Sequence, residues 1–194
     1  TKRFFGDLDR DGAVLHEILT KVEPIAPEQD AKLARLKKLL LDCARESKVL
    51  VFSYYTDTID YLFGELTRED FQRRLGKKVL HLAGRDSPEK RKLIVQEFLD
   101  GDADILLSTD ILSEGQNLQK ANTVINYDLH WAPTRMIQRV GRIDRIGSPF
   151  KEILLYNFFP EDELESLLEL VQTLQRKIEN FDRAVGLDAT VLGE

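Results

Sequence analysis

The sequence predicts an α/β protein with a mostly parallel sheet and a long C-terminal helix. Short, continuously apolar runs such as Lys48–Ser53 and Asp104–Leu107 are typical of strands covered on both faces, as parallel sheets require. Longer segments with apolar residues at helical spacing separate these runs. A leucine-rich stripe that starts after Pro160 and ends near Gly186 indicates the long final helix.

The predicted elements follow one another in a regular order. A helix with Leu33, Leu36 and Leu40 on one side leads into the first strand, and the next helix opens at Tyr54–Asp57. A helix that runs through Phe98 separates the second strand from the third. The predicted strands cover residues 48–53, 77–82, 104–107, 123–127 and 152–158.

The length of 194 residues suits one substantial core with a small appendage. We expect residues 1–27, which contain scattered Gly and Pro, to be a linker or a partly structured lead-in with a short helix at Val14–Leu19. Residues 28–160 would form the main lobe. Residues 161–194 would form a bracing helix and a tail.

The net charge of −6 is unevenly distributed. Residues 151–194 hold four basic and ten acidic residues, so residues 1–150 balance at 24 against 24 and are free to carry basic patches. No long apolar run or signal-type segment is present, which favours a cytoplasmic protein. Cys43 is expected to be a packed thiol, and no metal site is predicted because metal-ligand spacing is lacking.

The most informative stretch follows Pro133, which suits the first turn of a helix, and extends to Gly147, which suits its end. The spacing predicts a helix of about three turns. A row of guanidinium groups on one side matches phosphate oxygens, although a solvated basic face with local acidic partners is the other interpretation. At about 100° per residue, the polar face consists of Arg135, Gln138, Arg142 and Arg145.

A polar loop, Ser108–Leu118, precedes the strand at 123–127 and the arginine helix. The order of strand, loop, strand and arginine helix resembles motifs V and VI of superfamily-two helicases. The wording of Gln138–Gly147 is most similar to the double-stranded-DNA translocases related to SWI/SNF remodellers, including bacterial ones. The resemblance covers about residues 28–185, and it implies the C-terminal lobe of such a motor, with a RecA-like three-layer fold.

The resemblance also implies the roles of residues at a nucleotide site. Arg142 and Arg145 would be arginine fingers that supply positive charge to the γ-phosphate during its transfer. Gln138 would orient the phosphate or the attacking water. Gly115 would permit close approach of the backbone, and Asn117 would lie near the nucleotide ribose.

Polar residues that follow three of the predicted strands are candidate nucleic-acid contacts. Hydroxyl groups and the backbone N–H groups at strand ends and helix starts can bind phosphates without net charge. For the residues after the first strand, turn formation and helix capping alone are the other interpretation. The six candidates are Ser53, Tyr54, Gly84, Arg85, Ser87 and Thr109.

The chain has no phosphate-binding P-loop, so the resemblance implies that ATP and Mg²⁺ are held mainly by an upstream RecA-like lobe of the same polypeptide. The isolated chain would then be inactive as an ATPase. Duplex DNA or a nucleoprotein complex is the expected partner, and no membrane contact is expected. The alternatives are an RNA helicase lobe, disfavoured by Glu114 where many RNA helicases have Arg, and a non-catalytic nucleotide- or nucleic-acid-binding module.

Overall fold

The structure is a computed structural model, and it describes residues 2–44, 47–113, 118–130, 132–144, 148–162, 165–166 and 169–185. Its internal contacts divide the chain into two units, residues 1–38 and residues 39–194. Within the described ranges, every helix is too short or too polar to cross a membrane.

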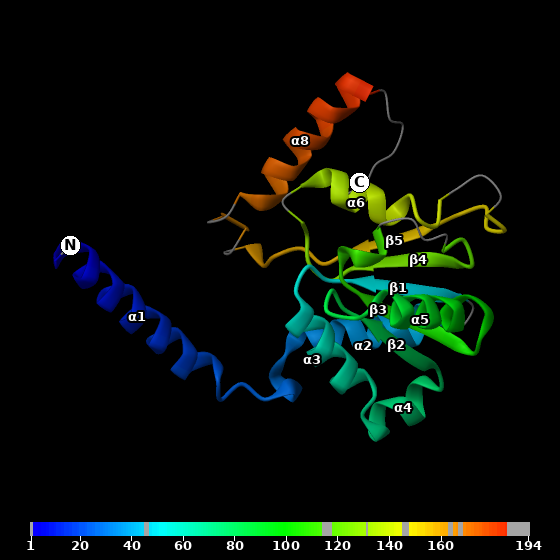
Figure 1. The fold of residues 1–194 in the computed structure, drawn as a ribbon, viewed down its shortest axis with the longest axis horizontal. Helices are drawn as coiled ribbons and strands as arrows, with labels where there is room; N and C mark the ends of the chain where they lie inside the picture. The colour runs from blue at the N-terminus through cyan, green and yellow to red at the C-terminus, as the bar shows by residue number, and fades with distance from the viewer. Residues whose placement is uncertain are drawn as a thin grey trace. The chain divides into compact units, whose positions relative to one another are not determined.

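The first unit contains the helix α1 (Lys2–Val22), a 3-10 turn (Pro27–Gln29) and the start of α2 (Ala31–Cys43). The expectation of only a short helix at Val14–Leu19 is therefore wrong, because helix covers the whole stretch from Lys2 to Val22 (Figure 1). Glycine costs a helix only about 1 kcal/mol per residue, which the surrounding helix-forming residues offset. The role of residues 1–27 as a linker stays a prediction.

The second unit is built on a sheet that has five parallel strands in the described part of the chain, in the order β2-β3-β1-β4-β5 (Figure 1). This arrangement confirms the predicted α/β fold. The apolar runs are buried as expected, since Leu50, Phe52 and Leu106 are fully inaccessible. The strands are β1 (Lys48–Phe52), β2 (Lys78–Leu82), β3 (Ala103–Ser108), β4 (Ala121–Asn126) and β5 (Leu154–Asn157).

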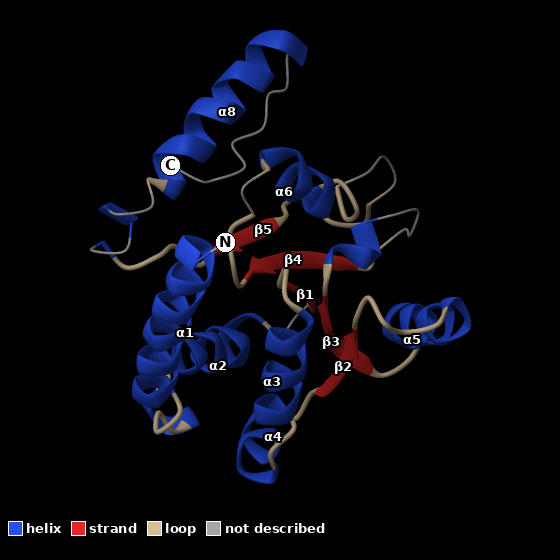
Figure 2. Ribbon diagram, turned by 60° about the vertical axis from the view of Figure 1, so that its left-hand side comes forward, coloured by secondary structure: helices blue, strands red, loops and turns tan. Residues whose placement is uncertain are grey.

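Helices cover both faces of the sheet. The connection from β1 to β2 runs toward one edge, through α3 (Thr56–Leu66) and α4 (Glu69–Leu75), whereas all later connections run the other way. Because crossovers between parallel strands are right-handed, this reversal puts α3 on the face opposite to α5 (Pro88–Asp100), as Figure 2 shows. The 3-10 helix η2 (Asp110–Ser113) packs on the same core as α5.

The arginine helix is shorter than predicted. Helix α6 runs from Pro133 to Val140 and not to Gly147, and a turn follows it. The turn redirects Ile143 into the core that α5 shares with the sheet, whereas Met136 of α6 belongs to a separate cluster. A straight helix would keep both apolar side chains on one stripe, so burial of Ile143 against the sheet accounts for the earlier end.

The C-terminal helix is also interrupted. A single helix from Pro160 is predicted, but α8 begins only at Leu170. Glu169 has a φ of 48°, in the left-handed region that breaks a right-handed helix. The Glu165 carboxylate accepts a hydrogen bond from the Val171 N–H (2.7 Å), so it caps the first turn of α8.

Candidate functional site

The candidate nucleic-acid residues gather at the carboxyl edge of the sheet. Phe52 of β1 is in register with Ser108 of β3, and Ser108 with Leu82 of β2. Ser53 and Thr109 come directly after two of these residues, so they lie at the same edge. The carboxyl ends of strands are where open α/β sheets bind their ligands.

The loop after β2 is exposed and stabilised by charged side chains. Arg85 forms an ion pair with Asp60 of α3 (Nη2 to Oδ1, 2.7 Å), a hydrogen bond that raises the pKa of Arg85. The Gly84 carbonyl accepts a hydrogen bond from the Arg91 guanidinium at 2.9 Å. The Ser87 hydroxyl accepts the Lys90 N–H at 3.3 Å and caps α5, and its role as a phosphate contact stays a prediction.

Ser53 and Tyr54 are held by one carboxylate from the end of β4. The Ser53 hydroxyl donates to Asp128 Oδ2, and the Tyr54 N–H donates to Asp128 Oδ1 at 2.9 Å. Ser53 is fully buried, whereas the Tyr54 side chain is 54% exposed. Ser53 therefore fixes the backbone of this loop, and Tyr54 is the member of the pair that presents a side chain to solvent.

Two further aromatic rings lie beside Tyr54. The Tyr55 ring is 5.1 Å away between centroids and perpendicular to it, and the His130 ring is 5.0 Å away at 65°. His130 Nδ1 accepts the Ala132 N–H at 2.8 Å, which fixes the imidazole. Burial lowers the pKa of His130, so the ring is neutral at physiological pH.

Thr109 is held tightly at the end of β3. It is almost fully buried, its N–H donates to the Leu82 carbonyl at 3.2 Å, and its carbonyl accepts from the Ser108 hydroxyl at 2.8 Å. Thr109 is thus anchored to the end of β2 and to the end of its own strand, β3. Gly115 and Asn117, the predicted nucleotide contacts, lie outside the described residues.

The centre of this edge is a buried arginine. Arg139 of α6 is fully inaccessible, and its Nε donates to Asp110 Oδ1 at 2.6 Å. Its Nη1 donates to Asn126 Oδ1 at 2.8 Å, and its guanidinium lies 5.2 Å from the centre of the Phe52 ring. Asn126 in turn donates to Asn157 Oδ1 at 2.7 Å. One side chain thereby links α6 to η2 and to the ends of β1 and β4.

The sequence patterns missed Arg139, although a signal was present. Three helical positions after Met136 correspond to about 300°, so Arg139 lies about 60° from Met136 and on the apolar side of α6. An arginine on an apolar face needs a buried acceptor, and Asp110 in the preceding loop provides one.

The predicted catalytic residues lie in and after α6. Gln138 is exposed, Arg142 is half-buried in the turn, and Arg145 lies outside the described residues. The main chain of Arg142 is fixed on both sides: its N–H donates to the Arg139 carbonyl (3.3 Å), and its carbonyl accepts from the Leu118 N–H (3.1 Å). The turn that carries Arg142 is thus attached both to the buried arginine and to the segment leading into β4.

Helix α8 supports α6 from outside the sheet. Leu174 of α8 is fully buried against Met136 of α6 and Leu129, with Val171 and Ile178 packed around them. This cluster fixes α6, which carries Arg139 and leads into the turn at Arg142, and it is separate from the core around the sheet.

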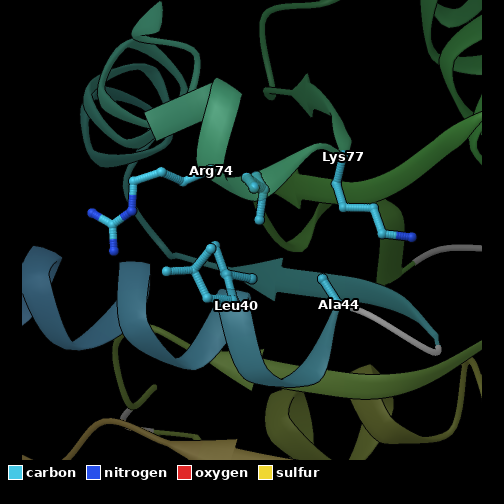
Figure 3. A pocket seen from close by; sticks show the side chains of 6 residues that line it. Leu40, Ala44, Arg74 and Lys77 are labelled. Carbon is cyan, nitrogen blue, oxygen red and sulfur yellow. The ribbon is translucent and has the colours of Figure 1, made fainter. Parts of the chain in front are cut away.

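A cavity of about 60 Å³ lies at the opposite, amino-terminal edge of the sheet (Figure 3). Arg74 and Lys77 point away from each other there, so they do not converge on one anion. Lys77 is also paired with Asp104 at 3.4 Å. The volume is far below the several hundred Å³ of a nucleotide site. Its lining residues are Leu40, Leu41, Ala44, Arg74, Leu75 and Lys77.

Comparison with known proteins identifies the fold family. The profile of the family described as "Helicase conserved C-terminal domain" matches residues 31–147. The chain belongs to the helicase C-terminal domain family. The C-terminal part of the Fun30 ATPase domain is similar in structure to this helicase C-terminal domain, with a TM-score of 0.65 and 28% sequence identity over 87% of this chain and 53% of that one. The predicted RecA-like fold is thereby confirmed.

Curated relatives of this helicase C-terminal domain include several kinds of helicase. An uncharacterised ATP-dependent helicase of Bacillus subtilis, YqhH, is 31% identical over 73% of this chain and 24% of its own length. The ATP-dependent RNA helicase DBP2 of Chaetomium globosum is 28% identical over 89% of this chain and 29% of its own. The ATP-dependent RNA helicase eIF4A of Botryotinia fuckeliana is 30% identical over 79% of this chain and 36% of its own length. The chain therefore spans only about a quarter to a third of the length of these relatives.

Proposed function

We propose that the chain is the second motor lobe of an ATP-dependent, SWI/SNF-like DNA translocase. The observation that supports it most directly is the fixed turn at Arg142, next to the exposed polar face of α6, in a domain of the helicase C-terminal family. The wording of Gln138–Gly147 supports the SWI/SNF-like assignment.

In this proposal Arg142 and Arg145 complete a nucleotide site whose phosphate-binding loop lies on an upstream lobe. When bound, ATP would supply the phosphoryl group, and Mg²⁺ would neutralise part of the charge on the phosphates. Arg142 places a guanidinium beside the γ-phosphate, where a correctly positioned arginine accelerates phosphoryl transfer about 10³-fold or more. Gln138, exposed on α6, orients the phosphate or the attacking water, and Gly115 and Asn117 approach the nucleotide.

The chain's fit to a nucleotide is partial. Arg142 and Gln138 offer donors on one side, but the sequence contains no P-loop to enclose the phosphates. The isolated chain is accordingly inactive as an ATPase in this proposal. ATP draws the two lobes together and hydrolysis releases them, which moves the protein along nucleic acid.

The nucleic-acid contacts of the proposal lie along the carboxyl edge, on the loops after β1, β2 and β3. Contacts from Gly84, Arg85, Ser87 and Thr109 go to phosphates and carry no sequence preference. Ser53 acts through the loop that it holds, because its hydroxyl is buried against Asp128. In the same proposal residues 1–27 connect the lobes, residues 28–160 form the lobe, and residues 161–194 include the helix that braces α6.

A second candidate is the corresponding lobe of an RNA helicase. It is favoured by the relatives named as ATP-dependent RNA helicases, DBP2 and eIF4A, whose identities of 28% and 30% are close to that of YqhH. Glu114 argues against it, because many RNA helicases have Arg at this place in motif V.

The test is ATP hydrolysis by the full-length protein with duplex DNA, single-stranded DNA and RNA at equal nucleotide concentration. The proposal expects the largest stimulation with duplex DNA. Stimulation by RNA alone would support the second candidate. A full-length protein that lacks an upstream P-loop and hydrolyses no ATP would leave only a binding module.

A further inference from the structure

We infer that Tyr54, Tyr55 and His130 form an aromatic platform on which an unpaired nucleobase of the bound strand stacks. The inference rests on the proposed function and deepens it, because it assigns a contact to a base where the proposed function has contacts to phosphates alone. These three residues are termed the aromatic platform.

The two tyrosines are accessible to solvent over more than half of their surface. Tyr54 and Tyr55 are 54% and 60% exposed, and their rings meet edge to face at an interplanar angle of 89°. The His130 ring, from the segment after β4, contacts the Tyr54 ring at an interplanar angle of 65°. Perpendicular rings form a corner in which a flat ligand can stack on one ring while its edge contacts the other.

The platform is rigid at its base. Asp128 accepts hydrogen bonds from both the Ser53 hydroxyl and the Tyr54 N–H, and the Tyr55 N–H donates to the Ser53 hydroxyl oxygen at 3.2 Å. Isolated exposed tyrosines need no explanation. The Tyr54 ring contacts both the Tyr55 ring and the His130 imidazole, and the Asp128 carboxylate holds the Tyr54 backbone, so the three rings form a preorganised surface.

The platform also lies where this fold offers a ligand crevice. The connection after β1 leads to α3 on one face of the sheet, and the connection after β4 leads to α6 on the side of α5. Tyr54 follows β1 and His130 follows β4, and these strands are neighbours. The platform therefore spans a topological switch point, the position at which open α/β sheets bind ligands.

The chemistry of the ligand follows from the rings. Every nucleobase has a π face, so stacking tolerates any sequence, as a translocating motor requires. A base inside a duplex has both faces covered by its neighbours. The platform thus takes a base from a single strand or from a locally opened duplex. The loss of one such stack weakens binding of a single strand by about 5- to 150-fold.

The test uses the full-length protein and measures its binding to a fluorescently labelled oligothymidine by anisotropy at several salt concentrations. We expect Tyr54→Ala to weaken binding about tenfold without changing the salt dependence, and Tyr54→Phe to retain most of the affinity. Arg85→Ala, by contrast, should reduce the salt slope by about one unit, since it removes a phosphate contact.

A second oligonucleotide of equal length and charge, but with abasic sites, separates bases from backbone. Wild-type protein should bind it more weakly than oligothymidine, and Tyr54→Ala should make no further difference. Tyr61→Ala is the matched control, because Tyr61 is also exposed but lies on α3. It should bind both oligonucleotides as the wild type does.

Three outcomes would overturn the platform. The first is unchanged affinity in Tyr54→Ala, and the second is an equal loss on the abasic strand, which would indicate a backbone contact. The third is a raised KM for ATP with unchanged binding of the oligonucleotide, which would assign the rings to adenine of the nucleotide. Failure of the proposed function is a separate result: ATP turnover would then persist in Arg142→Ala, whatever the oligonucleotide measurements give.

Discussion

Arg139 and Asp110 form a buried ion pair, with 2.6 Å between Nε and Oδ1, at the carboxyl edge of the sheet. The Arg139 side chain is fully inaccessible, and that of Asp110 is 11% exposed. Charges removed from water in this way are costly unless they are paired and hydrogen-bonded. The pair joins η2 to α6, the helix that carries Gln138 and leads into the turn at Arg142.

We expect Arg139→Ala to lower the free energy of unfolding by about 3–5 kcal/mol, because it leaves the Asp110 carboxylate buried without its cation. The double variant Arg139→Met/Asp110→Asn should recover part of this loss. Urea unfolding of the variants measures the difference. The control is Arg73→Ala, which breaks an exposed pair with Glu69 and should cost less than about 1 kcal/mol. Equal effects of the two arginine variants would contradict the importance of burial.

Arg142→Ala should reduce nucleic-acid-stimulated ATP turnover of the full-length protein by about 10³-fold while ATP binding changes little. The reason is that an arginine finger contributes mainly in the transition state. Steady-state kinetics and a fluorescent-nucleotide titration measure the two effects. Arg176→Ala, which removes an exposed arginine of α8, is the charge-matched control and should hydrolyse ATP as the wild type does. Turnover unaffected by the loss of Arg142 is incompatible with its role as a finger.

Glu169→Gly should raise the free energy of unfolding by about 0.5–1 kcal/mol. Glycine adopts the observed φ of 48° without the steric cost that a β-carbon imposes, although it also increases the freedom of the unfolded chain. The Glu169 side chain is exposed, so little contact is lost. Glu169→Ala retains the β-carbon and should give no such gain. Thermal unfolding of both variants decides the matter, and a gain of the same size with alanine would point to another cause.

The Cys43 thiol should react slowly with alkylating reagents. Burial raises its pKa from 9.0 to about 11, so at pH 8 the thiolate fraction is about 10⁻³, roughly a hundredfold below that of a free thiol. The alkylation rate should rise about tenfold per pH unit between pH 8 and pH 10. Mass spectrometry after timed iodoacetamide treatment measures it, with the urea-unfolded chain as the fast reference. A rate at pH 8 equal to that of the unfolded chain would show that the thiol is not protected.

Much of the fold could be predicted because continuous apolar runs in the sequence indicate strands that are buried on both faces. The run at Lys48–Ser53 matches β1 to within one residue, and the later strands were placed nearly as well. The ends of helices were harder, since Val140 and Leu170 mark boundaries that depend on where Ile143 packs and on the backbone of Glu169. Periodicity carries no information on such tertiary effects.

The candidate site divides in the same way. The sequence motifs predicted the positions of Arg142 and of the loops at the sheet edge, because these motifs have characteristic residues at a defined spacing along the chain. It did not identify Asp128 as the acceptor for Ser53 and Tyr54, since the pairing joins positions 74 and 75 residues apart and only the sheet topology brings them together.

The hydrogen bond from the Leu118 N–H to the Arg142 carbonyl closes a ring of contacts. From Leu118 the chain enters β4, which ends at Asn126; Asn126 binds Arg139, and the Arg139 carbonyl accepts the Arg142 N–H. The turn that carries Arg142 is therefore held at both ends by this ring of contacts, so a force applied there should move the lobe without bending the turn. If the proposed motor is correct, we expect displacement to occur at the junction between its two lobes, with this lobe moving as a rigid body.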